Sequence, residues 1–421
     1  MLTRRDFLRR GIVVLSAGLA LPPIFGKAVS ASAEAISTDP MFKDRVLVIV
    51  QMAGGNDGLN TVIPFAQGKY HDLRANIGIA DSEVIPLNDG VGLHPSLAKF
   101  KELWDQGVLG VVQGAGYPNP NLSHFRSMEI WQTANPDKPA TDGWAGRYLQ
   151  VLDEDGHPLD GLSVGSLLPM AMRASNTNVA VVDNLANYQL RADGSYPDDK
   201  DARLNALMNL YAKYPNRAPY AAVFQAVGPD AQQSAEALQQ ATAGYVPGAT
   251  YPTNSLGTGL KTLAQAINAN MGIKVFHIGI GGFDTHSNQL ATQTRLLQQL
   301  AEGLSAFYKD LQAHGKDKDV LVMTWSEFGR RPSENANRGT DHGTAGPMFL
   351  IGSQVRSGLY GETPSLTNLD HDNLKYTLDF RSVYSTVLSD WMGAPAQDIL
   401  GANFEHLPLL AGVKFMRQRR Y

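Results

Sequence analysis

The chain has 421 residues, of which 43% are hydrophobic and 18% charged, so it can bury a large core and has an ordinary composition for a globular protein. It contains no cysteine, which excludes disulfides, thiolate metal ligands and cysteine nucleophiles. Any bound metal must therefore be held by Asp, Glu, His, Asn or hydroxyl oxygen, a set that favours Zn²⁺, Mn²⁺, Mg²⁺ or Ca²⁺.

The N-terminal segment has the three regions of an export signal in order. Thr3-Arg4-Arg5-Asp6-Phe7-Leu8 resembles the twin-arginine signature, an apolar run at 11–25 follows, and Ala31-Ser32-Ala33 suits signal peptidase. We expect residues 1–33 to be removed, with the twin-arginine translocase as export partner and the periplasm or extracellular space as location. The apolar run is short and broken by two prolines, so no stable membrane span is expected after cleavage, and an uncleaved anchor stays the alternative.

The rest of the chain is acidic. Residues 1–33 hold five basic side chains and one acidic one, a net charge of +4, whereas the whole chain has −4. The part after the signal therefore carries about −8, which argues against a general nucleic-acid binder.

Alternating strand and helix patterns open the domain. Residues 45–50 form a β-branched run that predicts a buried strand, 96–104 have helical spacing, and 108–113 predict a second buried strand. A Gly/Pro/Asn loop leads to Ser123, a plausible N-cap for a helix that ends near 133. This order is typical of a doubly wound sheet.

The pattern changes from about 144 to 270 and then returns. A strand at 162–165 precedes helical stretches, which we interpret as a mainly helical insertion at about 198–271. The α/β pattern resumes with strands at 273–280, 320–325 and 347–351 and helices at 287–314 and 380–392. We therefore predict a single α/β domain over 45–421, with a mostly parallel sheet flanked by helices.

Polar residues follow the predicted strands. Carboxylates and imidazoles at the carboxyl ends of neighbouring buried strands are how an α/β fold builds a metal or catalytic centre. The candidate metal ligands are Asp57, Asp284, His286, Glu327, Asp341 and His342, and the candidate catalytic residues are Ser123, His124 and Arg330.

Several of these candidates have a structural alternative. Asp57 stands in a Gly/Asn/Asp turn, and Ser123 is at least as well explained as a capping serine. Asp284 and His286 are alternate residues that can share one metal, or they form a turn and a helix cap. Glu327 is a metal ligand or the partner of a nearby arginine, and Arg330 forms that ion pair or binds an anion.

Six motifs carry a family resemblance that covers most of the chain after the signal. They are Val-Gln-Met-Ala-Gly-Gly-Asn-Asp-Gly-Leu-Asn-Thr at 50–61, Leu-His-Pro at 93–95, Asn-Leu-Ser-His-Phe at 121–125, Gly-Phe-Asp-Thr-His at 282–286, Ser-Glu-Phe-Gly-Arg at 326–330 and Thr-Asp-His-Gly at 340–343. With these motifs the chain resembles the exported bacterial family known as domain of unknown function 1501. That family name supplies no activity.

In the order of its parts the chain also resembles, more distantly, the alkaline phosphatase and sulfatase superfamily. The resemblance implies an alkaline-phosphatase-like fold, with Asp57 and Glu327 at one metal and Asp284, His286 and His342 at the other. Ser123 would be the hydroxyl nucleophile between them. The chain departs from the superfamily at Ser326-Glu327, where an Asp-His pair is usual, and in the close spacing of Asp284 and His286. One, two or no metals therefore remain open.

These features lead to two functional expectations. The first is an exported, metal-dependent hydrolase of phosphate or sulfate esters, with Zn²⁺ or Mn²⁺, a small anionic ester as substrate, and His124 or Arg330 orienting the anion. The alternative is a catalytically degenerate superfamily member that binds a ligand or a partner in the cell envelope. Dispersed or arginine-neutralised carboxylates would favour the alternative, and convergent ones the enzyme.

Overall fold

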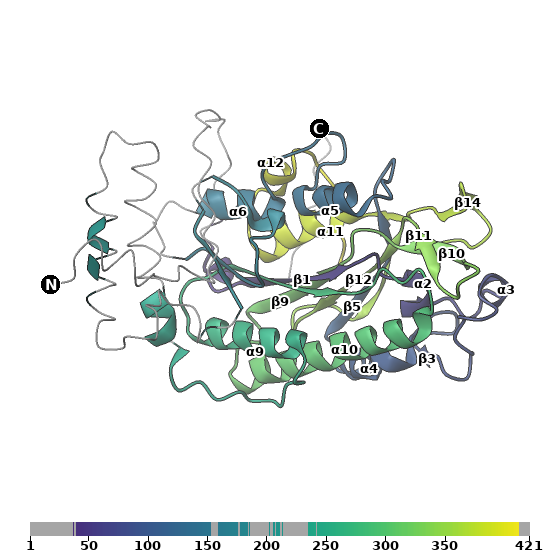
Figure 1. Cartoon of the computed structure of the whole chain (residues 1–421), viewed down its shortest axis with the longest axis horizontal. Coiled ribbons are helices and arrows are strands. Elements are labelled where there is room, and N and C mark those ends of the chain that lie inside the picture. Colours follow the sequence, from purple (N-terminus) through teal and green to yellow (C-terminus); the bar gives the residue numbers. More distant parts are fainter. Residues whose placement is uncertain are drawn as a thin grey trace.

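The computed structural model in Figure 1 describes most of the chain after the predicted signal. The described residues are 37, 39–152, 159–175, 177–183, 185, 202, 205, 206, 208–210, 213, 235–240 and 242–411. The predicted signal segment, 1–33, and most of the region 198–234 in the predicted insertion lie outside them. Among the described residues, no helix has both the length and the apolar character needed to cross a membrane.

A nine-stranded sheet forms the centre of the described structure. In spatial order its strands are β13 (Gly358–Tyr360), β5 (Leu109–Gly116), β12 (Gly346–Ile351), β9 (Val320–Trp325), β1 (Val46–Ala53), β8 (Val275–Gly281), β6 (Gly161–Val164) and β7 (Val179–Val182), with β16 (Leu378–Asp379) paired to β5. All pairs are parallel except those of β12, which is antiparallel to β5 and β9. Because β12 runs the opposite way, it begins at the edge where its neighbours end.

Helices cover both faces of this sheet (Figure 1). One face packs against α4 (Ala98–Asp105), α9 (Ser255–Asn268) and α10 (Gln289–Ala313). The other packs against α5 (His124–Thr133), α6 (Trp144–Leu152), α11 (Phe380–Thr386), its π-helical continuation (Val387–Trp391) and α12 (Ala396–Leu400). Helices on both faces of a mostly parallel sheet define the doubly wound α/β class.

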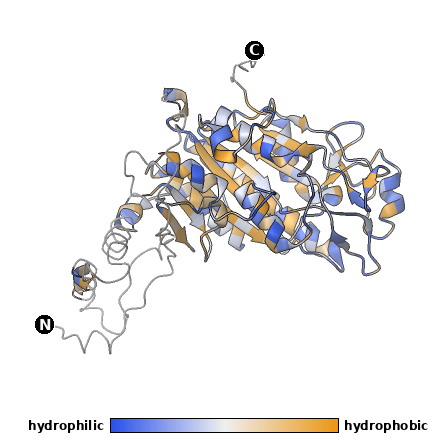
Figure 2. Ribbon diagram, turned by 90° about the horizontal axis from the view of Figure 1, so that it is seen from above, coloured by the Kyte–Doolittle hydropathy of each residue, from blue (hydrophilic) through white to orange (hydrophobic). Residues whose placement is uncertain are grey.

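Two apolar cores result from the alternation of side chains along the strands. Val48 and Val50 of β1 belong to the core under α9 and α10, whereas Leu47 and Ile49 belong to the core under α5 and α11. Successive residues of a strand point to opposite faces, so a strand that is covered on both faces must be apolar throughout. Figure 2 shows this as hydrophobic central strands between helices of mixed hydropathy.

Short elements gather beyond the carboxyl edge of the sheet (Figure 1). They are α2 (Gly58–Thr61), α3 (Lys69–Leu73), β2 (Val62–Ile63), β3 (Ile85–Pro86), β4 (Gly92–Leu93), the hairpin of β10 (Arg330–Glu334) and β11 (Thr340–His342), and the pair β14 (Leu369–Asp370) and β15 (Asn373–Leu374). A small third core that includes Leu59, Tyr70 and Leu374 lies among them. In the described part of the chain, 3₁₀ turns lie at Pro40–Phe42, Pro95–Leu97 and Met170–Met172.

The predicted α/β class is confirmed, and the predicted strands all form with shifts of a few residues at their ends. The sequence patterns did not predict β7, the β10–β11 hairpin or the short elements of 58–93. Within the predicted insertion, α9 packs on the sheet as a regular covering helix. The α/β layer therefore resumes well before residue 271.

The buried His277 of β8 makes stability depend on pH. Its ring lies 3.3 Å from both Ser163 Oγ and Gln51 Oε1, and burial lowers its pKa from 6.5 to about 4. As the pH falls, His277 is protonated in the unfolded chain before it is protonated in the folded protein. The contribution of the neutral, buried imidazole to the free energy of unfolding is therefore complete above pH 6.5 and is lost as the pH falls toward 4. At pH 5, protonation should cost the wild type about 2 kcal/mol that His277→Gln does not lose. Urea unfolding of both proteins at pH 7 and pH 5 measures this, and equal pH dependence would contradict it.

Candidate metal centre

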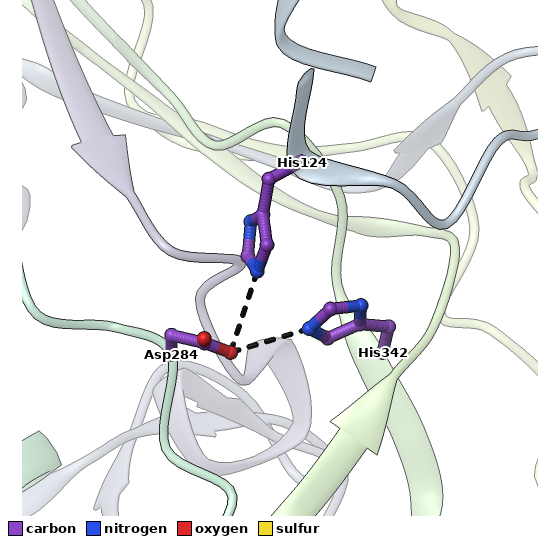
Figure 3. A group of neighbouring side chains, drawn as sticks. All are labelled: His124, Asp284 and His342. Carbon is purple, nitrogen blue, oxygen red and sulfur yellow. Dashed lines mark hydrogen bonds and ion pairs between the residues drawn. The ribbon is translucent and has the colours of Figure 1, made fainter. Parts of the chain in front are cut away.

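Side chains from four chain segments meet where the strands end. Asp284 follows β8, Glu327 follows β9, His124 opens α5 after β5, and His342 ends β11 just before β12. Ligand atoms of His124, Asp284 and His342 all lie within 4.8 Å of one another, and Figure 3 shows both rings directed at the Asp284 carboxylate. His286 lies beside this trio, with its Nε2 3.1 Å from Asp284 Oδ1. These four residues are called the His/Asp cluster below.

The orientation of His124 is fixed from behind by a carboxylate. Its Nδ1 lies 2.8 Å from Glu327 Oε1, and Glu327 is buried. A carboxylate only accepts hydrogen bonds, so Nδ1 carries a proton, and in the neutral ring Nε2 then has a free lone pair. That Nε2 lies 3.4 Å from Asp284 Oδ1 and is buried without a hydrogen-bond partner in the described structure. An acceptor pair of this kind requires a cation or an added proton between the two atoms.

His342 and His286 repeat this arrangement. His342 donates through Nδ1 to the carbonyl of Leu122 at 2.8 Å, and its Nε2 lies 3.2 Å from Asp284 Oδ1. His286 Nδ1 lies 3.4 Å from Asp341 Oδ1, and its Nε2 is 3.0 Å from His342 Nε2. Two nitrogens whose protons are on the far side of each ring repel one another unless a positive charge lies between them.

Asp284 is ionised at neutral pH. Burial raises its pKa, but the hydrogen bond and charge of Arg330, together with His342 and His124, lower it to about 2. Arg330 Nη2 lies 2.6 Å from Asp284 Oδ1. The carboxylate is therefore available as an anionic ligand, although it shares one oxygen with a guanidinium.

The cluster fits a divalent cation by its donor set and spacing. Imidazole nitrogens whose other nitrogen is hydrogen-bonded to a carboxylate or carbonyl are the usual ligands of Zn²⁺. Ligands at zinc bond lengths in a tetrahedral site are about 3.3 Å apart. The distances from Asp284 Oδ1 to His124, His286 and His342 Nε2 are 3.4, 3.1 and 3.2 Å.

Asp57, a predicted metal ligand, is placed in a buried ion pair instead. Arg74 Nη1 and Nη2 lie 2.5 and 2.9 Å from its two carboxylate oxygens, and both side chains are at most 1% exposed. Asp57 also caps α2 through Leu59 N, and Gln289 Nε2 donates to it at 2.5 Å. Its oxygens are thus occupied, and the turn alternative describes its role better than metal binding.

Glu327 and Asp341 contact the Nδ1 atoms of His124 and His286, on the side of each ring that faces away from the His/Asp cluster. Glu327 Oε1 accepts from Gly54 N at 2.9 Å as well as from His124, and Asp341 Oδ1 accepts from Asn335 Nδ2 at 3.1 Å as well as facing His286. Both residues were predicted as direct ligands. The structure gives them the task of fixing ring orientation, because the ring nitrogen that they contact is the one turned away from the cluster.

The two other predicted catalytic residues, Arg330 and Ser123, differ in whether their polar groups are available to a ligand. Arg330 directs all three guanidinium nitrogens at protein acceptors, namely Asp284, His286 Nε2 at 3.5 Å and the carbonyls of Gly54, Gly55, Phe283 and Thr340, so its hydrogen bonds are made within the protein and it is not set up as an anion clamp. Ser123 is exposed at the N-cap of α5 and its side chain makes no capping bond. Ser123 thus occupies the predicted N-cap position without a capping side-chain hydrogen bond, and its hydroxyl is exposed.

Three residues that matter here were not predicted from the sequence. Arg74 comes from the unpredicted segment 58–93 and carries no motif. Gln289 and Gln293 lie one turn apart on the buried face of α10. Two amides at that spacing on an apolar face were a signal, because buried polar groups need specific partners.

The chain belongs to the family described as "Protein of unknown function (DUF1501)", whose model matches residues 109–391. This confirms the resemblance to domain of unknown function 1501. No curated protein matches the sequence.

Several solved structures are similar at low identity. A protein in the alkaline phosphatase superfamily from Vibrio parahaemolyticus is 12% identical, with a TM-score of 0.37, over 87% of this chain and 74% of that one. The zinc complex of the C-terminal periplasmic domain of EcEptC from Escherichia coli is 9% identical, with a TM-score of 0.33, over 76% and 77%. Alkaline phosphatase from the Antarctic bacterium TAB5 is 10% identical, with a TM-score of 0.31, over 76% and 94%. At these scores the similarities say nothing about activity.

The Asp57–Arg74 pair predicts a stability phenotype. Arg74→Met leaves a buried, unpaired carboxylate and should cost about 3–5 kcal/mol in the free energy of unfolding. The double variant with Asp57→Asn should recover part of that loss, because the carbonyls of Arg331 and Pro332 still lack the Arg74 donor. Lys101→Met, which breaks the exposed pair with Asp105, is the matched control and should cost under about 1 kcal/mol. Urea unfolding measures all three variants. A loss of bound metal in Asp57→Asn without a loss of stability would instead identify Asp57 as a ligand.

Proposed function

We propose that this protein is an exported, metal-dependent hydrolase of phosphate or sulfate esters. The observation that carries the proposal is the convergence of His124, Asp284 and His342, with His286 beside them, at the carboxyl edge of the sheet. In the proposed site these residues hold one divalent ion, Zn²⁺ or Mn²⁺. Ligands in an open α/β sheet bind outside the carboxyl ends of its strands, which supports this edge as the active site.

A bound ion would decide whether the site accepts an anionic substrate. Asp284, Glu327 and Asp341 supply three negative charges and Arg330 one positive charge, so the surroundings carry −2 with neutral histidines. A bound divalent ion would cancel this charge and leave its own open coordination position for an anion. The N-terminus of α5, which presents Ser123, adds backbone N–H groups that attract anions.

Ser123 is the proposed nucleophile. In the proposed reaction its hydroxyl oxygen attacks phosphorus or sulfur, the alcohol leaves with the ester oxygen, and water then releases phosphate or sulfate from the serine. When bound, the ion lowers the pKa of a neighbouring hydroxyl or water and stabilises negative charge on the transferred group. Glu327 and the Leu122 carbonyl hold the protons of His124 and His342 on the nitrogens that face away.

A second candidate function is a ligand-binding envelope protein without catalysis. The pairing of Asp57 with Arg74 and of Asp284 with Arg330 favours it, because these pairs leave a single cluster where the superfamily resemblance implied two metal sites. Such a protein would bind zinc and gain thermal stability from phosphate or sulfate, but it would turn over no ester.

Removing cluster residues tests the hydrolase. Asp284→Ala and His342→Ala should lose stoichiometric metal and at least about 10²-fold in hydrolysis of aryl phosphates or sulfates, while Ser123→Ala keeps the metal and loses hydrolysis. Metal analysis and an ester panel measure both properties. His371→Ala, at a histidine that is 95% exposed and paired with Asp370, is the control and should change neither. A wild type without metal or turnover would refute the proposal.

Export can be tested separately. Replacing Arg4 and Arg5 by lysine removes the twin-arginine pair while keeping its charge, and the protein should then accumulate in the cytoplasm. Cell fractionation with immunoblotting follows this, and unchanged export of the double variant would exclude the twin-arginine route.

A further inference from the structure

Gln289, the first residue of α10, places a buried amide behind the His/Asp cluster. Its side chain has no solvent exposure, and its Oε1 accepts from Thr285 Oγ1 at 2.9 Å and from Thr340 Oγ1 at 2.6 Å. Its Nε2 donates to Asp57 Oδ2 at 2.5 Å and to Gln293 Oε1 at 3.0 Å. Both lone pairs and both protons of the amide are thus used.

The two threonines belong to the two arms that carry the cluster. Thr285 stands between Asp284 and His286, and Thr340 precedes Asp341 and His342. The backbones of the arms are joined where Thr340 N donates to Thr285 O at 3.1 Å, and Arg330 donates to both Thr340 O and Asp284. The carboxamide of Gln289 adds a further connection, through the threonine side chains of the two arms.

The Asp57–Arg74 pair anchors this connection to the scaffold. Asp57 holds the Gln289 amide, and Arg74 donates to the carbonyls of Arg331 and Pro332 at 3.1 and 2.9 Å. Those carbonyls belong to β10, the strand that pairs with β11 and so supports His342. The hydrogen-bonded chain therefore runs from β10 through Arg74, Asp57 and Gln289 back to both arms.

We propose that Gln289 is a positioning residue that holds the Asp284–His286 arm and the His342 arm at metal-binding distance. The inference rests on the proposed metal site and adds to it a residue that touches neither metal nor substrate. Glutamine suits this position because its amide supplies two acceptor sites and two protons, all of which are used. A glutamate would face the Asp57 carboxylate, and an apolar residue of the same length would leave two threonine hydroxyls without their acceptor.

Zinc affinity of the full-length protein tests the proposal. Gln289→Met keeps the length of the side chain and removes its hydrogen bonds, so the Kd for Zn²⁺, measured by chelator competition, should rise about 10- to 100-fold. Gln265→Met is the matched control. It makes the same substitution on the neighbouring covering helix α9, where Gln265 Nε2 donates to the Thr242 carbonyl at 3.0 Å, away from Gln289 and its partners. Its Kd should stay within about threefold of wild type, a change that corresponds to under 1 kcal/mol.

Variants at the threonines locate the effect. Thr285→Val and Thr340→Val each remove one hydroxyl and keep the shape, so each should weaken zinc binding by part of the Gln289→Met effect. In the triple variant, Gln289→Met should add little, because its partners on the arms are already gone. Fully additive losses would overturn the proposal, as would wild-type affinity in Gln289→Met or an equal loss in Gln265→Met.

A metal-free measurement separates this proposal from the proposed function. Imidazole ¹⁵N chemical shifts of His286 and His342 should change in Gln289→Met, while those of His314, at the far end of α10, should not. If the wild type binds no zinc but these shifts change, the metal site fails and the positioning role stands. Unchanged shifts at His286 and His342 overturn the positioning role whether or not zinc binds.

Discussion

The geometry of the site depends on the hydrogen bonds that the guanidinium of Arg330 donates. It is buried and donates to carbonyls of Gly54 and Gly55 after β1, of Phe283 after β8, and of Thr340 in β11, as well as to the Asp284 carboxylate. Loops that end parallel strands bring many carbonyls to one place, and buried carbonyls need donors. One rigid fork with five N–H groups satisfies them together, and in doing so it sets where Asp284 and His342 lie.

Next to Arg330, the His/Asp cluster consists of imidazoles whose protons lie on the ring nitrogens that face away from Asp284. Glu327, the Leu122 carbonyl and Asp341 face the Nδ1 atoms of His124, His342 and His286, which leaves Nε2 lone pairs around an ionised Asp284. The Arg330 guanidinium compensates part of this negative charge at Asp284 Oδ1, and a cation between the Nε2 atoms would compensate the rest, which is the physical basis of the proposed metal site. Behind the cluster, hydrogen bonds continue from Gln289 to Asp57 and from Asp57 to Arg74.

The sequence was most informative about strands and least informative about the partners of each polar residue. β1, β8 and β9 were predictable because a strand covered on both faces must be apolar, and the polar residues after them stood out for the same reason. Direct ligands and orienting residues use the same amino-acid types, so Asp57, Glu327 and Asp341 were indistinguishable from Asp284. His124 was expected to orient an anion, yet its Nε2 faces the cluster.

Local periodicity along the chain is enough to predict the α/β class, the succession of strands and helices, and the set of residues from which the cluster is drawn. Which of those residues converge depends on contacts between segments that are far apart in the sequence. Arg74, Gln289 and the antiparallel direction of β12 act across separations of many residues, and local patterns carry no information on such pairings. The hydrogen-bond partner that each residue meets in the fold decides its role: Asp57 anchors the network, Glu327 orients a histidine ring and His124 is a candidate ligand.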